Sequence, residues 1–428
     1  MRTLEYAKEP RAVLELAHRR WGVDREIEER VREILHAVET EGDEAVTTLT
    51  RQLDCRFIDS LGLRLSDRER EAAYRGVNRE FLTSLRLARS RIVAYHKRQL
   101  RTSWTLTLRG MKVQHRIAPL RRVGIYVPGG KAAYPSTVLM NAIPAGIAGV
   151  KEIVMATPCN NEGKIAPQVL VAASECGVTE IYRIGGAQAI GALAFGTESI
   201  RRVDKITGPG NAYVAAAKQL VYGRVGIDII AGPTEIVIIA DESARPAFIA
   251  ADLIAQAEHD DNATPICITD SRRLSEEVRA ELHGQLETAP RRMVAQRALQ
   301  NHGTIILVER LAQAALIVNE LAPEHVEIIT RQPRRLAQRI TNAGAIFVGP
   351  WSTEALGDYI AGPNHTLPTS GTARFSSALS VYDFMKFTNV IEFTRQSFLR
   401  LAADVEILAE SEGLAGHAES VRIRKGAT

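Results

Sequence analysis

The feature that most constrains the fold is a regular alternation of short apolar segments and helical segments from Arg122 to Gly349. Several apolar segments run into a turn rich in Gly, Pro or Asp, as in VGIYVPGG (Val123–Gly130). Alternating strands and helices are typical of a parallel sheet with helices on both faces. The sequence therefore predicts an α/β fold. The alternation restarts at Glu235, which predicts two α/β halves.

The remaining segments surround these halves. We expect a helical N-terminal region with a short hairpin over residues 1–121, partly packed on the second α/β half. The first half is predicted over 122–233 and the second over 234–380. Residues 381–428 are predicted to be mostly helical. With 428 residues, the chain exceeds the size at which one hydrophobic core usually keeps growing, so several domains are expected.

Composition excludes several classes of protein. Lys plus Arg number 54 and Asp plus Glu number 50, and the resulting net charge of +4 is too small for a nucleic-acid-binding surface. No run of about 18 apolar residues predicts a membrane span, and the N-terminus has no apolar signal segment. The four cysteines form no Cys-x-x-Cys pair, which indicates a reducing compartment. We therefore expect a cytoplasmic protein that binds neither nucleic acid nor membrane.

Glycine-rich turns follow several predicted strands of the first half. The dinucleotide fingerprint G-x-G-x-x-G is absent, but Gly129-Gly130, Gly185-Gly186 and Gly208-Pro209-Gly210 all come directly after strands. Such turns either let a phosphate approach the backbone or are tight turns without a ligand, and the residues alone leave both alternatives open. Because open parallel sheets bind ligands at the carboxyl ends of their strands, we expect the site there.

The segment DLIAQAEHD (Asp252–Asp260) carries a possible half of a metal site. Gln256 and His259 are three residues apart and share a face at the end of a predicted helix. A side-chain carbonyl oxygen and an imidazole on one face can bind a metal ion. The alternative is that His259 is a surface or helix-capping histidine.

Three other segments combine carboxylates with imidazoles. Glu324 and His325 adjoin a strand and could form an acid-base pair, or could be two exposed polar residues after a proline. The Gly/Pro-rich loop GDYIAGPNHTLPT (Gly357–Thr369) contains Asp358 and His365. The last helical segment contains Glu412 and His417, a pattern that an ordinary amphipathic helix also explains.

Four of these residues form a ligand set of nitrogen and oxygen atoms without sulfur. Such a set suits zinc with open positions, or manganese or cobalt. Sequence spacing does not show whether the four residues meet. They are Gln256, His259, Asp358 and His417.

Taken together, these motifs closely resemble the histidinol dehydrogenase family, from about residue 20 to the end and in unbroken order. The segments that carry the resemblance are VGIYVPGGKAAYPSTVLMNAIPA, GGAQAIGALAFGTESI, VDKITGPGNAYVAAAK, AGPTEIVIIAD, DLIAQAEHD, APEHVEI, GDYIAGPNHTLPTSGTARFSS and GLAGHAESV. The resemblance implies two incomplete Rossmann-like halves, similar to those of aldehyde dehydrogenases, between helical N- and C-terminal segments. It also implies oxidation of L-histidinol through L-histidinal to L-histidine with two NAD, the last steps of histidine biosynthesis.

The resemblance also implies roles for individual residues. Glu324 and His325 would be the acid-base pair, with His325 taking the alcohol proton and Glu324 helping to activate water. One zinc per subunit would be held by Gln256, His259, Asp358 and His417, which would also face the substrate with His325. Further substrate contacts would come from Thr234, His365 and Glu412, and cofactor contacts from Tyr126, Gln188 and Asn211.

The family is homodimeric, with a C-terminal segment that completes the partner's site. We therefore expect Glu412 and His417 to act across the subunit interface. Two positions depart from many relatives, namely Phe387, where Arg is common, and Thr234, where some have Ser. They keep open the alternative of a paralogue that oxidises another small primary alcohol, such as sulfopropanediol. Retention of Glu412 and His365 disfavours that alternative, and the filled acid-base and metal positions disfavour a non-catalytic scaffold.

Overall fold

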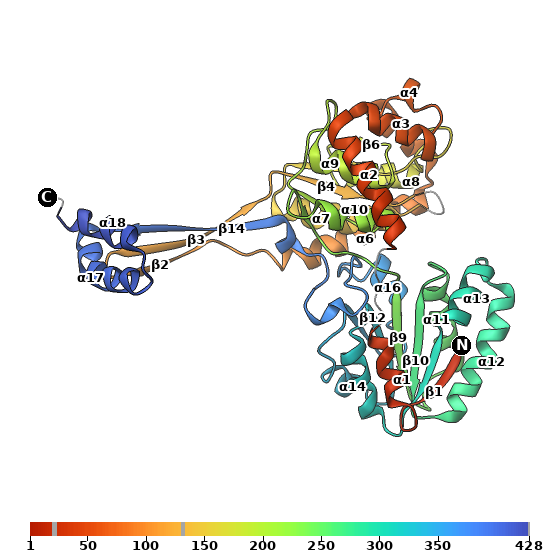
Figure 1. Cartoon of the computed structure of the whole chain (residues 1–428). Coiled ribbons are helices and arrows are strands. Elements are labelled where there is room, and N and C mark those ends of the chain that lie inside the picture. The colour runs from red at the N-terminus through yellow and green to blue at the C-terminus, as the bar shows by residue number, and fades with distance from the viewer. Residues whose placement is uncertain (19–23, 130–132, 427–428) are drawn as a thin grey trace. The chain divides into compact units, whose positions relative to one another are not determined.

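The computed structural model describes residues 1–18, 24–129 and 133–426 (Figure 1). Contacts divide the chain into two compact units. The first combines Met1–Gln99 with Leu120–Phe384, and the second combines Leu100–Pro119 with Met385–Thr428. Gly130, predicted in a glycine turn, lies outside the described residues. The four-part division by sequence remains a proposal about folding domains.

One five-stranded parallel sheet of the first unit corresponds to the predicted first half. Its strand order is β6-β5-β4-β7-β8, so the order reverses direction between β4 and β7. The strands are β4 (Arg122–Tyr126), β5 (Glu152–Ala156), β6 (Glu180–Tyr182), β7 (Lys205–Thr207) and β8 (Gly226–Ile227). Its helices are α7 (Pro135–Ala148), α8 (Pro167–Glu175), α9 (Gly186–Phe195) and α10 (Ala212–Val221).

Most of the N-terminal helices pack on this sheet's hydrophobic core. Residues such as Val31, Val38 and Ile92 belong to the same buried cluster as Val123 and Ile125. The helices are α2 (Arg25–Glu41), α3 (Asp43–Leu53), α4 (Ile58–Leu61), α5 (Asp67–Ala72) and α6 (Arg79–Lys97).

The second sheet has six parallel strands in the order β1-β11-β10-β9-β12-β13, and its order reverses between β9 and β12. The strands are β1 (Arg2–Glu5), β9 (Glu235–Ala240), β10 (Thr264–Thr269), β11 (Thr304–Leu307), β12 (His325–Ile329) and β13 (Ala345–Val348). The sequence did not predict β1, which pairs in parallel with β11 and thus attaches the chain's first residues to the second half.

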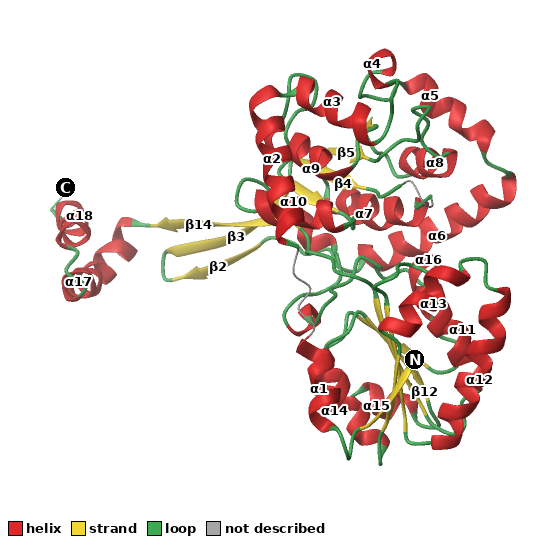
Figure 2. Cartoon of the chain, turned by 45° about the vertical axis from the view of Figure 1, so that its right-hand side comes forward, coloured by secondary structure: helices red, strands yellow, loops and turns green. Residues whose placement is uncertain are grey.

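Helices cover both faces of this sheet (Figure 2). Successive side chains of a strand point to opposite faces. Ile236 and Ile238 of β9 therefore pack in the core with α11 to α13, whereas Val237 and Ile239 pack in the core on the other face. The helices are α1 (Pro10–Glu15), α11 (Pro246–Ala257), α12 (Arg272–Thr288), α13 (Arg292–Asn301), α14 (Leu311–Leu321), α15 (Pro333–Ala337) and α16 (Glu354–Tyr359). Buried residues on both strand faces confirm the predicted α/β class.

The second unit contains a three-stranded antiparallel sheet and two helices. The strands β2 (Trp104–Leu108) and β3 (Met111–Pro119) form the predicted hairpin. The expectation that residues 381–428 are mostly helical is incomplete, because β14 (Met385–Phe393) pairs with β3 along its whole length. Helices α17 (Arg395–Ser411) and α18 (Ala415–Lys425) follow. Among the described helices, none combines the length and apolar character that a membrane span requires.

Candidate active site at opposite ends of two sheets

A cavity of about 300 Å³ in the first unit is lined by six of the twelve predicted site residues. Pro128 and Pro209 reach it from the carboxyl ends of β4 and β7. Thr234, Glu324 and His325 reach it from the amino ends of β9 and β12. The expectation that the site lies at carboxyl ends is therefore right for the first sheet and wrong for the second. In the second sheet, Glu324 lies just before β12 and His325 is the first residue of that strand.

His325 is the first residue of β12 and is 3% exposed. Its Nδ1 lies 3.0 Å from the carbonyl oxygen of Glu235, and because a carbonyl only accepts, Nδ1 carries the proton. Burial lowers the pKa of His325, so the ring is neutral near pH 7. Its Nε2 is buried and has no hydrogen-bond partner among the described residues. The lone pair on Nε2 is therefore available to accept a proton.

Glu324 lies beside His325 with its carboxyl group held on one side. Thr234 Oγ1 donates to Glu324 Oε2 at 2.6 Å, and the Glu235 amide donates to the same oxygen at 3.0 Å. Burial outweighs these bonds and raises the pKa of Glu324 to about 8. Since Oε2 lies 3.5 Å from His325 Nδ1, the two side chains form a pair of adjacent proton-exchanging groups.

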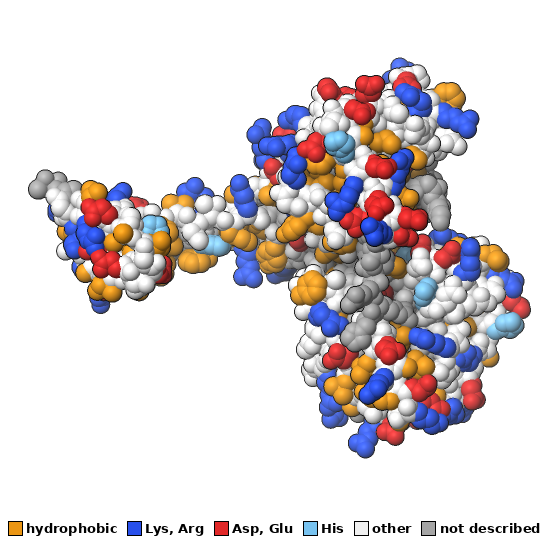
Figure 3. All heavy atoms as spheres, viewed as in Figure 1, with side chains coloured by type: hydrophobic (Ala, Val, Ile, Leu, Met, Phe, Trp, Pro, Cys, Tyr) orange, Lys and Arg blue, Asp and Glu red, His pale blue; other side chains and the backbone are white. Residues whose placement is uncertain are grey.

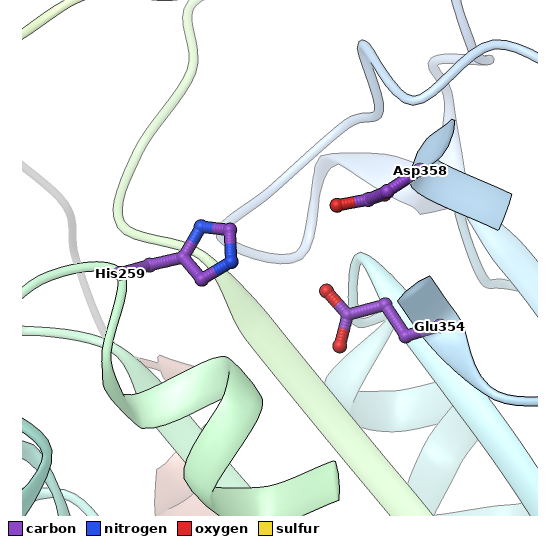
Figure 4. A group of neighbouring side chains, drawn as sticks. All are labelled: His259, Glu354 and Asp358. Carbon is purple, nitrogen blue, oxygen red and sulfur yellow. The ribbon is translucent and has the colours of Figure 1, made fainter. Parts of the chain in front are cut away.

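A second group in the cavity has the composition of a metal site (Figure 4). His259 follows α11, and its ring points toward the carboxylates of Glu354 and Asp358 on α16. One ligand atom from each residue lies within 4.8 Å of the others. Burial and nearby carboxylates, Asp358 first among them, raise the pKa of Glu354 well above its ordinary value. A buried and a half-buried carboxyl group beside an exposed imidazole fit a divalent cation, which would offset the like charges.

Glu354 was not among the residues predicted from the sequence, because its spacing from Asp358 is informative only once both are known to lie on a helix. Glu354 and Asp358 are four residues apart and so share a face of α16. Gln256, a predicted ligand, is fully buried beside them. Its amide lies between the Thr234 hydroxyl and the Glu354 carboxyl, within hydrogen-bond distance of both. The structure thus brings together Gln256, His259 and Asp358, and adds Glu354.

His365 lines the same cavity from the Gly/Pro-rich loop. Its Nδ1 lies 3.1 Å from the carbonyl oxygen of Asp358, so Nδ1 is the donor and Nε2 remains an acceptor. Burial lowers the pKa of His365. A neutral imidazole with a free acceptor suits contact with a polar substrate group.

Two predicted cofactor residues meet at the start of α9. The Gly186 amide donates to Tyr126 Oη at 3.1 Å, and the Gly185 amide donates to Asp54 Oδ2 at 3.2 Å. The buried Gln188 donates to Asp54 Oδ2 at 3.4 Å, while its Oε1 has no partner among the described residues. The Gly185-Gly186 turn therefore has its amides already paired within the protein. Gln188 Oε1 is the unpaired acceptor that fits a cofactor hydrogen-bond donor.

The turn Gly208-Pro209-Gly210 after β7 is also held internally. The Gly208 amide donates to Asp228 Oδ2 at 2.8 Å, and Lys218 Nζ donates to the Gly208 carbonyl oxygen at 3.0 Å. Lys218 and Asp228 form a buried ion pair with each other. Asn211, the third predicted cofactor residue, caps α10 by accepting from the Val214 amide at 3.1 Å. Gly210 of this turn lines the cavity.

Glu412 and His417 belong to the second unit, where Glu412 ends α17 and His417 lies on α18. Both side chains are exposed. This unit also exposes large apolar side chains, orange in Figure 3. They include Leu106, Leu108, Phe387, Ile391, Ile407, Leu408 and Ile423.

Comparison with known proteins gives a consistent result. Residues 18–425 match the sequence profile of a family described as histidinol dehydrogenase. The chain is 50% identical over 399 residues to histidinol dehydrogenase of Synechococcus sp., covering 93% of this chain and 92% of the relative. It is also 50% identical to the Bacillus subtilis enzyme, covering 92% of each. A crystal structure of histidinol dehydrogenase from Elizabethkingia anophelis superposes with a TM-score of 0.92 at 35% identity, covering 99% and 98% of the two chains.

Proposed function

Because this chain belongs to the histidinol dehydrogenase family, we propose that its cavity oxidises L-histidinol through L-histidinal to L-histidine with two molecules of NAD. Family membership makes the chain an NAD-dependent oxidoreductase of histidine biosynthesis. The names of its relatives do not favour a paralogue acting on another alcohol. The proposal includes a cytoplasmic location, as is usual for a biosynthetic enzyme.

The observation that carries the proposal is the unpaired Nε2 of neutral His325 beside a metal-type group. His325 accepts the proton of the substrate hydroxyl as hydride leaves the carbon, and its Nδ1–H remains fixed on the Glu235 carbonyl. Bound NAD supplies the hydride acceptor, and Tyr126, Gln188 and Asn211 hold it.

Glu324 acts in the second oxidation. A pKa of about 8 lets this carboxyl exchange a proton near neutral pH. It removes a proton from the water that hydrates the aldehyde, while Thr234 keeps the carboxyl in place. Oxidation through a hydrate requires no thiol. The cysteines Cys55, Cys159 and Cys267 are buried, and burial raises the pKa of Cys267 to about 12, which disfavours a thiolate nucleophile.

Zinc is the metal that we propose for the acidic group, one per subunit. Gln256, His259 and Asp358 would hold it, with His417 of the partner subunit, and Glu354 lies within reach. When bound, the ion would orient the substrate by contacting the imidazole and amino nitrogens of histidinol. Thr234, His365 and Glu412 of the partner subunit complete the substrate contacts.

We further propose a homodimer with sites shared between subunits. The buried residues of α17 and α18 are all small, namely Ser397, Ala402, Ala409 and Ala418. Such a unit buries few large side chains of its own, while it exposes many apolar ones. A second copy of the chain would cover this apolar surface. Glu412 and His417 of each subunit would then complete the site of the other.

The decisive test is the yield of NADH at 340 nm with limiting L-histidinol, before and after metal removal by a chelator. We expect two NADH per histidinol, loss of the reaction with the chelator, and recovery with zinc. A metal-loaded protein that reduces no NAD with histidinol would refute the substrate, and other primary alcohols would then be tested. Full activity in protein shown to be free of metal would refute the zinc assignment alone.

A further inference from the structure

One buried and one half-buried carboxyl group lie at the start of α16, the helix that carries Glu354 and Asp358. Glu327 is the third residue of β12 and is 1% exposed. Its Oε1 accepts a hydrogen bond of 2.6 Å from the Glu354 amide. Asp252 of α11 accepts a 2.9 Å bond from Thr353 Oγ1. Each carboxyl group therefore holds one of the two residues with which α16 begins.

Helix α16 needs this support because it does not cap itself. Thr353 is in the N-cap position, but its side chain makes no capping hydrogen bond to the helix. The first amides of a helix require acceptors, and a carboxylate is a favourable one at this positive end. Glu327 supplies that acceptor from a neighbouring strand, and Asp252 turns the Thr353 hydroxyl away from the capping position.

The two carboxyl groups also interact with each other. Burial and the nearby Asp252 charge raise the pKa of Glu327 to about 9. Glu327 Oε2 has no hydrogen-bond partner among the described residues. The oxygens that hold the start of α16 are therefore Glu327 Oε1 and Asp252 Oδ1.

We propose that the Asp252–Glu327 pair is a positioning device that fixes α16 and so sets Glu354 and Asp358 against His259. The proposal rests on the metal site of the proposed function. Glu354 and Asp358 lie one helical turn apart, so a shift at the start of α16 moves both. Glu327 shares a strand face with His325, two residues earlier. Strand β12 thus carries the base His325, and through Glu327 it also holds α16, the helix of Glu354 and Asp358.

The test compares Glu327→Gln with Glu327→Leu. The side-chain oxygen of Gln can accept from the Glu354 N–H, as Glu327 Oε1 does, whereas Leu cannot. We expect zinc affinity, measured by competition with a chromophoric chelator, to stay within about threefold for Gln. For Leu it should fall about 10–100-fold, the usual effect of losing a group that orients a ligand. We also expect faster hydrogen exchange over residues 354–359 in the Leu variant.

Because Leu at this buried position could prevent folding, Thr353→Val serves as a second, milder probe. It removes the hydroxyl that bonds Asp252 and leaves every proposed ligand intact. We expect zinc affinity to fall several-fold with little change in the KM for NAD.

Three results would overturn the positioning role. Glu327→Leu could fold and bind zinc like the parent, Glu327→Gln could bind as weakly as Glu327→Leu, or Thr353→Val could leave both zinc affinity and hydrogen exchange unchanged. If the parent protein itself bound no zinc, the metal assignment of the proposed function would fail instead. The two failures are distinguishable, because the hydrogen-exchange comparison tests the positioning role without metal.

Discussion

The chemistry of the site depends on which nitrogen of each histidine is protonated. In two of these histidines, a hydrogen bond to a backbone carbonyl group determines which nitrogen carries the proton. Glu235 fixes Nδ1 of His325, and Asp358 fixes Nδ1 of His365. Both rings therefore present Nε2 as an acceptor, and neither choice is visible in the sequence, because each depends on a carbonyl group from another segment.

We expect His325→Asn to lower kcat by about 10²–10⁴-fold, the usual contribution of a general base, because Asn can keep a donor near Glu235 but supplies no base. The measurement is steady-state NADH formation with histidinol, together with circular dichroism to confirm the fold. A variant that keeps the parent kcat would remove His325 from this role.

Glu180 gives a prediction about stability and pH. Arg122 donates to both of its oxygens and holds the pKa of Glu180 at about 2. Because the pKa of Glu180 is lower in the folded state, the stabilisation is fully present above the pKa of the unfolded state, near 4.5. It is lost as the pH falls toward 2.

We expect Glu180→Gln to remove on the order of 2 kcal/mol of this acid-dependent stability, seen in denaturant unfolding between about pH 5 and pH 2. Glu242→Gln, at an exposed ion pair, is the matched control and should change little. Equal pH profiles for the parent and Glu180→Gln would contradict the prediction.

At the scale of elements, the turn after β7 is the most constrained loop of the site. Gly208 has φ of +112°, and a side chain there would overlap the Tyr126 carbonyl oxygen. Its amide and carbonyl groups are held by Asp228 and Lys218. The turn can therefore neither accept a larger residue nor move without losing its hydrogen bonds to the buried Lys218–Asp228 ion pair.

We expect Gly208→Ala to lower the free energy of unfolding by on the order of 2–4 kcal/mol and to raise the KM for NAD. Gly284→Ala, on α12 with nothing within 4 Å of the added carbon, should instead raise stability by about 0.5–1 kcal/mol. Thermal and denaturant unfolding of the two variants measure both effects. A stable Gly208→Ala protein with an unchanged KM would show that the turn tolerates this change.

The sequence predicted the two α/β halves because apolar strands and helical periodicity are local signals. It missed β1 and β14, whose strand character depends on partners far along the chain, β11 and β3. It also missed Glu354, because the helix of only six residues that pairs this acid with Asp358 has no clear periodicity. The resemblance implied the roles proposed for His259, Asp358 and the Glu324–His325 pair. Their proximity and protonation depend on contacts between distant segments.

For the whole molecule, the proposed homodimer predicts how variants of two different residues would complement each other. The proposal places His417 of the partner subunit in a site with Glu324. A mixed dimer of Glu324→Gln and His417→Asn chains then has one doubly damaged site and one intact site.

We expect an equal mixture of the two inactive variants, unfolded and refolded together, to recover about a quarter of the parent activity. Half of the dimers are then mixed, and each has one intact site. Differently tagged chains purified together confirm that mixed dimers form. No activity in such purified mixed dimers would contradict a shared site.

The pairing of β1 with β11 also has a consequence for synthesis. Arg2 and Thr304, which lie side by side in the finished sheet, are separated by 302 residues of chain. At about 5–20 residues per second, a ribosome takes roughly 15–60 s to make the partner of β1 after β1 itself. During that time the strand has no native neighbour. Its length of four residues and its charged ends, Arg2 and Glu5, limit its pairing with the strands of other nascent chains.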